Sequence, residues 1–160
     1  MMTREQAQEI WDYIKPIKVA MVTSHDHGQL RARPMRHEQE DFDGVLWFFT
    51  SKASDKVAEL AEDARVCATY ADTSSGTYVS LSGAVRFTDD SALIDKFWNA
   101  EAAAWFPDGK DDPNVALMGI YVEQAEVWDS KSNAMVKLYE IAKANLTGKT
   151  PDMHDNRKYG

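Results

Sequence analysis

The residues best suited to chemistry lie where an aromatic run gives way to a helix-like one, in the segment WFFTSKASDKV. The run ends in two hydroxyls, Thr50 and Ser51, and a third, Ser54, stands where the helix would begin, with Lys52 and Lys56 on either side of it. Unpaired N–H groups at a helix start attract anions, and hydroxyl and ammonium donors add charge-assisted hydrogen bonds. The segment therefore suits a terminal phosphate, although an ordinary helix capped by Ser54, with solvated lysines, fits the same pattern.

A second candidate is the short run RARPM. Strand alternation would place Arg31, Arg33 and Met35 on one face. Pro34 has no N–H, so it indicates a sheet edge or a break in the ladder, where neighbouring backbone groups stay available to a ligand. An ordinary edge strand with solvated arginines is the alternative.

Other chemistry-bearing residues give weaker signals. His25 and His27 stand at an expected hairpin tip without further spaced ligands, which predicts a solvated turn and no metal site. Cys67 lies in the apolar run VCATYA, which predicts a buried, unreactive thiol. The acidic run from Glu38 to Asp43 is interpreted as solvated loop charge. The chain contains no Gly-x-Gly-x-x-Gly run, P-loop or nucleophile elbow.

Composition limits the classes of function. The 160 residues are 44% hydrophobic and 28% charged, which is typical of one globular domain with a sizeable core. The formal net charge of −8 disfavours nucleic-acid and anionic-membrane partners, whose phosphates are also negative. The densest basic run, within residues 31–36, does not form a basic patch, because acidic residues follow it at once. One cysteine permits no internal disulfide, and the run TREQAQEIWDYIK lacks the apolar stretch of a signal peptide, so a cytoplasmic protein is expected.

Apolar periodicity outlines the elements that must position the candidate residues. A first helix carries a capping-box pattern at Thr3 and Gln6 and ends at Pro16. Strands are expected at about residues 17–24, 29–39, 45–50, 66–70, 78–87 and 114–128. Further helices are expected at about residues 54–64, 91–105 and 132–146, the last one burying Met135, Leu138, Tyr139 and Ala142.

Strands joined in sequence by short turns favour an antiparallel sheet closed into a barrel over a doubly wound parallel sheet. The predicted fold is therefore mainly β with helices (α+β), a six-stranded antiparallel barrel with N- and C-terminal helices. Residues 1–146 are expected to form a single domain, and residues 147–160 a weakly patterned C-terminal tail.

These segments, in order and at their spacing, resemble the pyridoxamine 5′-phosphate oxidase-like family of FMN-binding split-barrel proteins, and most closely its general stress protein branch. The likeness runs from about Ile10 to Ile141. It rests on RARPM, FDGVLWFFTSKASDKVAEL, RVCATYAD, YVSLSGAV, a helix ending AWFPDG, and AEVWD. The resemblance implies a split β-barrel that holds FMN in a groove between the two subunits of a homodimer.

The resemblance also implies a set of FMN-binding residues. They are Arg33, Pro34 and Met35 beside the isoalloxazine, Phe48, Phe49, Thr50 and Ser51 around the ring and the ribityl chain, Lys56 at the phosphate, and Trp105 and Trp128 near the flavin. Either the same subunit or its partner could supply Trp105.

The activity implied is that of an FMN-dependent oxidoreductase with an unknown small substrate. Alanines at 102–104 stand where a lysine is common in the family, and the product-holding residues of true pyridoxamine 5′-phosphate oxidases are not found, so vitamin B6 oxidation is not expected. Flavin chemistry needs few catalytic side chains, because the cofactor carries the electrons. A flavin carrier or sensor without turnover is therefore the alternative, as is a groove that holds a deazaflavin or haem.

Overall fold

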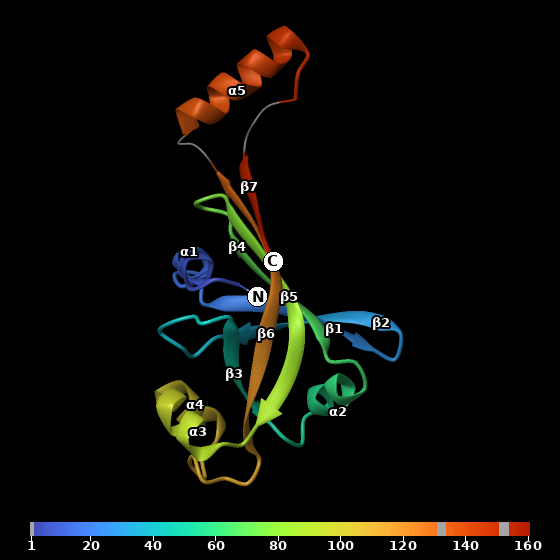
Figure 1. The fold of residues 1–160 in the computed structure, drawn as a ribbon, viewed down its shortest axis with the longest axis vertical. Helices are drawn as coiled ribbons and strands as arrows, with labels where there is room; N and C mark the ends of the chain where they lie inside the picture. The colour runs from blue at the N-terminus through green and yellow to red at the C-terminus, as the bar shows by residue number, and fades with distance from the viewer. Residues whose placement is uncertain (1, 131–133, 151–153) are drawn as a thin grey trace.

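The computed structural model describes residues 2–130, 134–150 and 154–160, and Figure 1 shows the order of its elements. The helices are α1 (Arg4–Ile14), α2 (Asp55–Glu62), α3 (Ser91–Phe97), α4 (Ala100–Trp105) and α5 (Ala134–Thr147). The strands are β1 (Val19–Asp26), β2 (Gln29–Arg36), β3 (Val45–Ser51), β4 (Arg65–Asp72), β5 (Thr77–Thr88), β6 (Val115–Ser130) and β7 (His154–Tyr159). The chain is thus mainly β with a few helices, the predicted α+β class.

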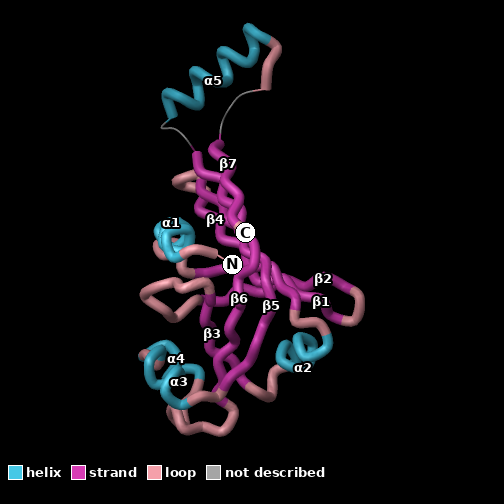
Figure 2. The backbone as a smooth tube through the Cα atoms, viewed as in Figure 1, coloured by secondary structure: helices cyan, strands magenta, loops and turns pink. Residues whose placement is uncertain are grey.

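One antiparallel sheet holds the seven strands of the described residues, in the order β2–β1–β4–β5–β6–β3, with β7 also paired with β6. The sheet curves along its length (Figure 2), and a bulge bends its longest ladder at Ser82/Gly83. Glycine is required there, because a Cβ on Gly83 would lie 2.0 Å from the backbone oxygen of Tyr121. The two end strands of the order, β2 and β3, share no ladder in the described part of the chain, so the barrel is split between them.

The inner face of the sheet carries the core. Burial alternates along β1, β4 and β5, as the period of two predicts. Helix α1 closes one side with the buried residues Ala7, Ile10, Trp11 and Ile14, and its predicted Thr3–Gln6 capping box is formed. A second, smaller cluster joins α3 to the start of β6 and consists of Ile94, Phe97, Phe106, Val115 and Leu117. Leu117 of β6 belongs to the smaller cluster and its neighbour Met118 to the main core, so the two clusters lie on opposite faces of the sheet.

The C-terminal segment differs from its prediction as a tail, because residues 154–159 form the seventh strand. β7 pairs with β6 from Ala125 opposite Tyr159 to Ser130 opposite His154. Its sequence HDNRKY has no apolar alternation, and the pairing rests on backbone hydrogen bonds along an available edge and on contacts such as Asn156 Nδ2 donating to Glu126 Oε1 at 2.8 Å. A sequence pattern does not reveal these long-range contacts. Tyr159 is buried and joins the main core.

Helix α5 extends beyond the ends of β6 and β7 (Figure 1). The predicted burial of Ala142 is wrong for this chain, since Ala142 is exposed, and Leu146 is 88% exposed. The side chains of Met135, Leu138 and Tyr139 lie outside the described residues. The described C-terminal half of α5 therefore buries no large apolar side chain.

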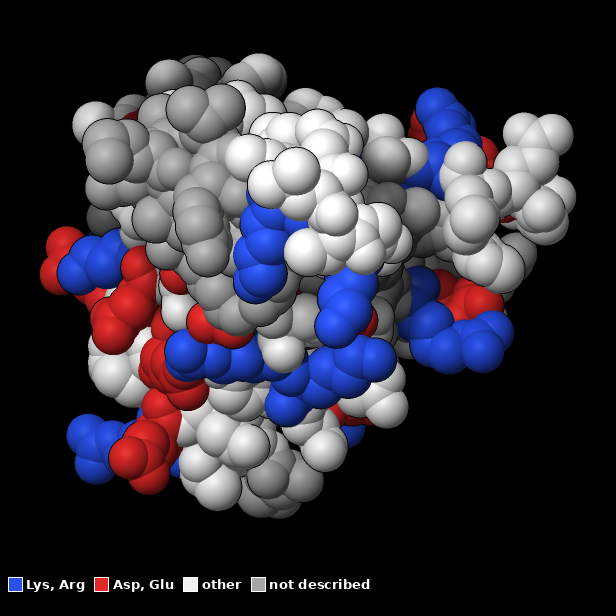
Figure 3. Space-filling model, turned by 90° about the horizontal axis from the view of Figure 1, so that it is seen from above, with Lys and Arg blue, Asp and Glu red and all other residues white. Residues whose placement is uncertain are grey.

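Charged side chains of both signs share the surface seen from above in Figure 3, with basic residues near the middle and acidic residues toward one side. Exposed ion pairs among the described residues include Lys110–Asp95 and Lys158–Glu126. Among the described residues, no helix is both long and apolar enough to cross a membrane.

The edge of β3 that faces the split is only partly satisfied by other backbone groups. At its beginning the side chain of Gln39 replaces a strand: its Nε2 donates to Val45 O at 2.6 Å, and its Oε1 accepts from Trp47 N at 2.7 Å. Glu38 N donates to Trp47 O at 3.2 Å. Beyond Trp47 the two end strands diverge, and the residues that follow border a cleft.

His37 is buried next to Glu38 and Gln39, the residues that bond the beginning of β3. Its side chain is 6% exposed, its ring lies 4.9 Å from that of Trp11, and its Nδ1 lies 3.0 Å from Tyr70 Oη. Burial, helped by the nearby charges of Arg36 and Lys18, lowers the pKa of His37 to about 4. The folded protein therefore holds a neutral imidazole at neutral pH.

This histidine predicts a loss of stability in mild acid. The unfolded chain takes up a proton near pH 6.5 and the folded chain only near pH 4, so lowering the pH from 7 to 5 favours unfolding by roughly 2 kcal/mol. We expect His37→Gln to remove most of this pH dependence, as measured by urea denaturation at both pH values. The control His25→Gln, at an exposed histidine, should retain it; equal pH dependence in both variants would assign the effect elsewhere.

Candidate functional site

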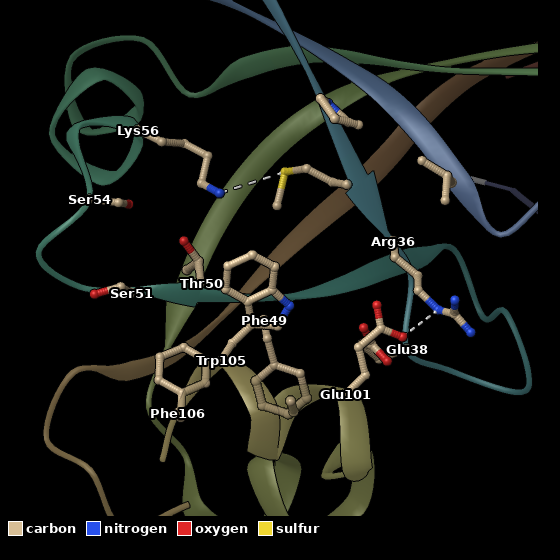
Figure 4. Close-up of a pocket in the computed structure, with 14 residues that line it drawn as sticks. Arg36, Glu38, Phe49, Thr50, Ser51, Ser54, Lys56, Glu101, Trp105 and Phe106 are labelled. Carbon is tan, nitrogen blue, oxygen red and sulfur yellow. Dashed lines mark hydrogen bonds and ion pairs between the residues drawn. The ribbon is translucent and has the colours of Figure 1, made fainter. Parts of the chain in front are cut away.

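A cleft of about 620 Å³ opens where β2 and β3 separate. Figure 4 shows its lining side chains, which come from the ends of these strands and from α2 and α4. The lining residues are Val19, Pro34, Met35, Arg36, Glu38, Phe49, Thr50, Ser51, Ser54, Lys56, Glu101, Ala102, Trp105 and Phe106. The two segments that sequence analysis singled out are therefore brought together at one site.

One end of the cleft gathers hydroxyl and ammonium groups. Thr50 lies on β3, opposite Ala116 of β6, and is only 5% exposed. Ser51 ends the strand, Ser54 precedes α2, and Lys56 is in the first turn of that helix, with its Nζ 3.8 Å from Met35 Sδ. Figure 4 shows Thr50, Ser54 and Lys56 pointing toward the same space, whereas the hydroxyl of Ser51 points away from it. Ser51 Oγ accepts a hydrogen bond from Ala53 N at 3.3 Å.

Two of these hydroxyls are buried without a protein partner. Thr50 Oγ1 and Ser54 Oγ make no hydrogen bond among the described residues. The alternative of a plain helix cap is thus wrong in one respect, because Ser54 Oγ does not cap α2. A buried hydroxyl left unpaired costs on the order of 1–3 kcal/mol, so both groups are available to a ligand that enters the cleft. A phosphate accepts hydrogen bonds from such donors and fits this end of the cleft.

The strand β2 contributes the middle of the cleft. Pro34 and Met35 both line it, Met35 being buried and Pro34 exposed. Arg33 does not line it: its Nη1 donates to Ser24 Oγ at 3.0 Å, further along the hairpin toward its tip. Of the three residues of RARPM expected beside the flavin, Pro34 and Met35 therefore line the cleft and Arg33 does not.

Aromatic side chains form much of the remaining wall. Phe49, Trp105 and Phe106 line the cleft, and the indole of Trp105 is 78% exposed at its mouth. Phe48 points the other way and is buried in the main core, as alternation along β3 requires.

Trp128 lies far from the cleft of its own chain. It is twelve residues further along β6 than Ala116, which is about 40 Å of strand at ~3.3 Å per residue. It stands opposite Tyr78 of β5, half-buried on the outer side of the sheet. A single chain therefore does not bring Trp128 together with the other predicted site residues.

The opposite end of the cleft is acidic and was missed by sequence analysis. Glu38, interpreted as solvated loop charge, is half-buried in the cleft, where its Oε2 accepts from Asn99 Nδ2 at 2.5 Å. Burial, together with the charge of Glu101, raises the pKa of Glu38, against the lowering effect of the Asn99 hydrogen bond. Glu101 Oε2 lies 3.1 Å from Arg36 Nε.

This acidic end depends on a break in a helix that sequence analysis predicted as continuous. Trp98 is extended between α3 and α4, and Asn99 caps the second helix by accepting from Ala102 N at 2.8 Å. The break turns Glu101 and Trp105 toward the cleft. The signal was present, because an asparagine before AEAAAW is a typical helix start.

A family model and a curated protein both match most of this chain. The family model described as "Pyridoxamine 5'-phosphate oxidase like" matches residues 5–152. General stress protein 26 of Bacillus subtilis is 25% identical, over 82% of this chain and 94% of its own length.

Several solved structures with the same fold are more than 30% identical to this chain. A protein of the general stress protein 26 type from Jannaschia sp. CCS1 is 31% identical over 98% of this chain and 99% of its own, with a TM-score of 0.72. A general stress FMN/FAD binding protein from Xanthomonas citri is 32% identical over 82% of this chain and 93% of its own, with a TM-score of 0.71.

Proposed function

The chain belongs to the pyridoxamine 5′-phosphate oxidase-like family, and on this premise we propose that it is an FMN-dependent oxidoreductase that acts on a small substrate in the cytoplasm. The observation that carries the proposal is the pair of buried hydroxyls beside Lys56 in the cleft, those of Thr50 and Ser54, which have no partner in the described part of the chain. The similarity to a general stress protein described as FMN/FAD binding supports a flavin as the ligand.

The phosphate of FMN suits the hydroxyl end of the cleft. It carries nearly two negative charges at neutral pH and several acceptor oxygens. Thr50 and Ser54 can each donate one hydrogen bond, Lys56 adds a positive charge, and the first turn of α2 presents its dipole. Binding would thus satisfy the hydroxyls of Thr50 and Ser54, which have no hydrogen-bond partner among the described residues.

The middle of the cleft suits a flat ring system. Pro34, Met35, Phe49 and Trp105 offer apolar and aromatic surface there. A bound flavin supplies hydride and electron transfer, while the chain's own residues bind it, orient it and exclude water. The end beyond these side chains carries Glu38 and Glu101, and Arg36, which lines it too, is paired with Glu101 at 3.1 Å. We therefore expect the phosphate of a phosphorylated vitamin B6 to be a poor fit there.

The phosphate site predicts a difference between FMN and riboflavin. We expect riboflavin to bind much more weakly, and Lys56→Ala to weaken FMN by roughly 1.5–3 kcal/mol, about ten- to a hundredfold, with little effect on riboflavin. Thr50→Val should also weaken FMN, yet it should raise the melting temperature of the flavin-free protein, because it removes a buried unpaired hydroxyl. Fluorescence titration of both flavins and thermal melts measure these effects.

The matched control is Lys52→Ala. Lys52 lies in the same segment but pairs with Asp89 at 2.6 Å outside the cleft, so its loss should leave FMN affinity nearly unchanged. Equal weakening of FMN and riboflavin by Lys56→Ala would contradict its role at the phosphate.

Redox behaviour separates an enzyme from a carrier or sensor. We expect the absorption spectrum of the loaded protein to be that of FMN and not of a deazaflavin or haem. NADH, NADPH or another two-electron donor should bleach it without oxygen, and an added acceptor should restore it, at turnover on the order of 1 s⁻¹ or more. A flavin that dithionite reduces but no biological donor does would instead support a carrier or sensor.

We further propose that the protein works as a homodimer joined through the outer face of the sheet. Val19, Met21 and Tyr78 are apolar there and between 37% and 44% exposed. The row Pro34, Met21, Thr69 and Ser80 crosses four adjacent strands without a charge.

Two features tie this face to the cleft. Val19 and Pro34 also line the cleft, so a second copy on this face would border it. Trp128, next to Tyr78, would then lie at the interface, although it is remote from the cleft of its own chain.

The proposed interface predicts the mass of the protein in solution and one position at which a charged substitution should separate the subunits. Light scattering should give about twice the 18.0 kDa chain mass, and Met21→Glu should yield monomers that bind FMN more weakly, because it buries a charge in an apolar contact. Leu146→Glu, at an exposed apolar position of α5 away from this face, should leave the mass unchanged. The reverse result would place the interface on α5.

A further inference from the structure

We propose that the end of the cleft lined by Glu38, Glu101 and Trp105 is a subsite for a cationic group, so that the second ligand of this protein carries an ammonium, amidinium or guanidinium. The inference rests on the proposed function to the extent that FMN occupies the other end of the same cleft. It names the chemical class of the substrate or electron donor, which the flavin site by itself leaves open.

The polar groups of the cleft are segregated by charge. Lys56 and the hydroxyls of Thr50 and Ser54 lie at the end formed by β3 and α2. Glu38 and Glu101 lie at the end formed by the β2–β3 connection and α4, and Figure 4 shows their carboxyl groups close together. A ligand that bridges the two ends therefore meets donors at one end and acceptors at the other.

The positive charge that lines the acidic end, that of Arg36, is already paired with a carboxylate. Arg36 Nε pairs with Glu101 at 3.1 Å, whereas Glu38 accepts its hydrogen bond from a neutral amide, that of Asn99. Burial and the charge of Glu101 raise the pKa of Glu38, and the Asn99 hydrogen bond and the charge of Arg36 offset this only in part, so ionised Glu38 lacks full compensation. A cation in the cleft would provide it, and an anion would meet two carboxylates.

Trp105 adds a second feature that suits a cation. Its indole is 78% exposed at the mouth of the cleft, and in the view of Figure 4 it projects between the lysine end and the glutamate end. The face of an indole attracts ammonium and guanidinium groups, and this attraction adds to that of a nearby carboxylate.

An independent observation marks the cavity as a ligand site. Thr50 is 5% exposed, yet its Oγ1, like Ser54 Oγ, has no partner among the described residues and lies in the same cleft. The volume of about 620 Å³ falls within the range of small-molecule sites, roughly 300–1,000 Å³. The carboxylates thus border a built cavity, in contrast to a group of acidic residues on an open surface.

The test uses three aromatic probes of nearly equal shape: benzamidine is a cation, benzamide is neutral and benzoate is an anion. Calorimetric titration into flavin-loaded and flavin-free protein should give benzamidine at least tenfold tighter binding than benzoate, the scale of one charge-assisted hydrogen bond. Glu38→Gln, which can keep the hydrogen bond from Asn99, should reduce this preference several-fold, and Trp105→Ala should weaken benzamidine further.

The control addresses the overall charge of −8, which attracts any cation weakly. Glu123→Gln, at an exposed glutamate of β6, changes the net charge by the same amount as Glu38→Gln and should preserve the preference. Benzoate binding as tightly as benzamidine, or a preference that survives Glu38→Gln combined with Glu101→Gln, would overturn the proposal.

The two proposals fail separately. If wild-type protein binds FMN but shows no preference for benzamidine, the cation subsite is wrong and the flavin site stands. If FMN does not bind, the titration of flavin-free protein still decides whether the acidic end selects cations.

Discussion

The structure depends on one constraint, the unpaired edge of β3. A strand at the end of a sheet leaves its N–H and C=O groups without partners, and they must be satisfied in some other way. Here the side chain of Gln39 satisfies Val45 and Trp47, and the edge beyond them borders the cleft. Had β2 paired with β3 along its whole length, the barrel would be closed and the cleft would not exist.

The elements around this edge are arranged so that each contributes one kind of group. The end of β3 and the start of α2 bring hydroxyls and Lys56, and β2 brings the apolar surface of Pro34 and Met35. Helix α4 brings Glu101 and Trp105, because Asn99 starts a new helix there. The cleft is therefore polar at both ends and apolar in the middle, with opposite charge preference at the two ends.

This arrangement has a cost in the folded protein. Thr50 Oγ1 and Ser54 Oγ are buried without a partner among the residues that the structure describes, and Glu38 is half-buried beside another carboxylate. Such groups lower the stability of an unliganded protein and are favourable only when a ligand satisfies them. The core beneath α1, with its fully buried Ile10 and Ile14, supplies apolar burial that can offset this cost.

The sequence by itself determined the features that depend on local chemistry. Alternation predicted the inward and outward faces of the strands, and capping chemistry predicted the start of α1. The hydroxyls and lysine of WFFTSKASDKV predicted an anion site, and the structure gathers these groups at one end of a cleft. Of the implied flavin residues, Pro34, Met35, Phe49, Thr50, Ser51, Lys56 and Trp105 line one cleft.

Only the tertiary structure decided the features that depend on contacts between distant segments. The sequence pattern could not show that Glu38 is half-buried, because Asn99, its partner, is 61 residues away. Nor could it show that HDNRKY completes the sheet, since that pairing rests on backbone groups every residue has. Arg33, Phe48 and Trp128 lie outside the cleft for the same reason: strand direction and register, set by the whole sheet, fix where each side chain points.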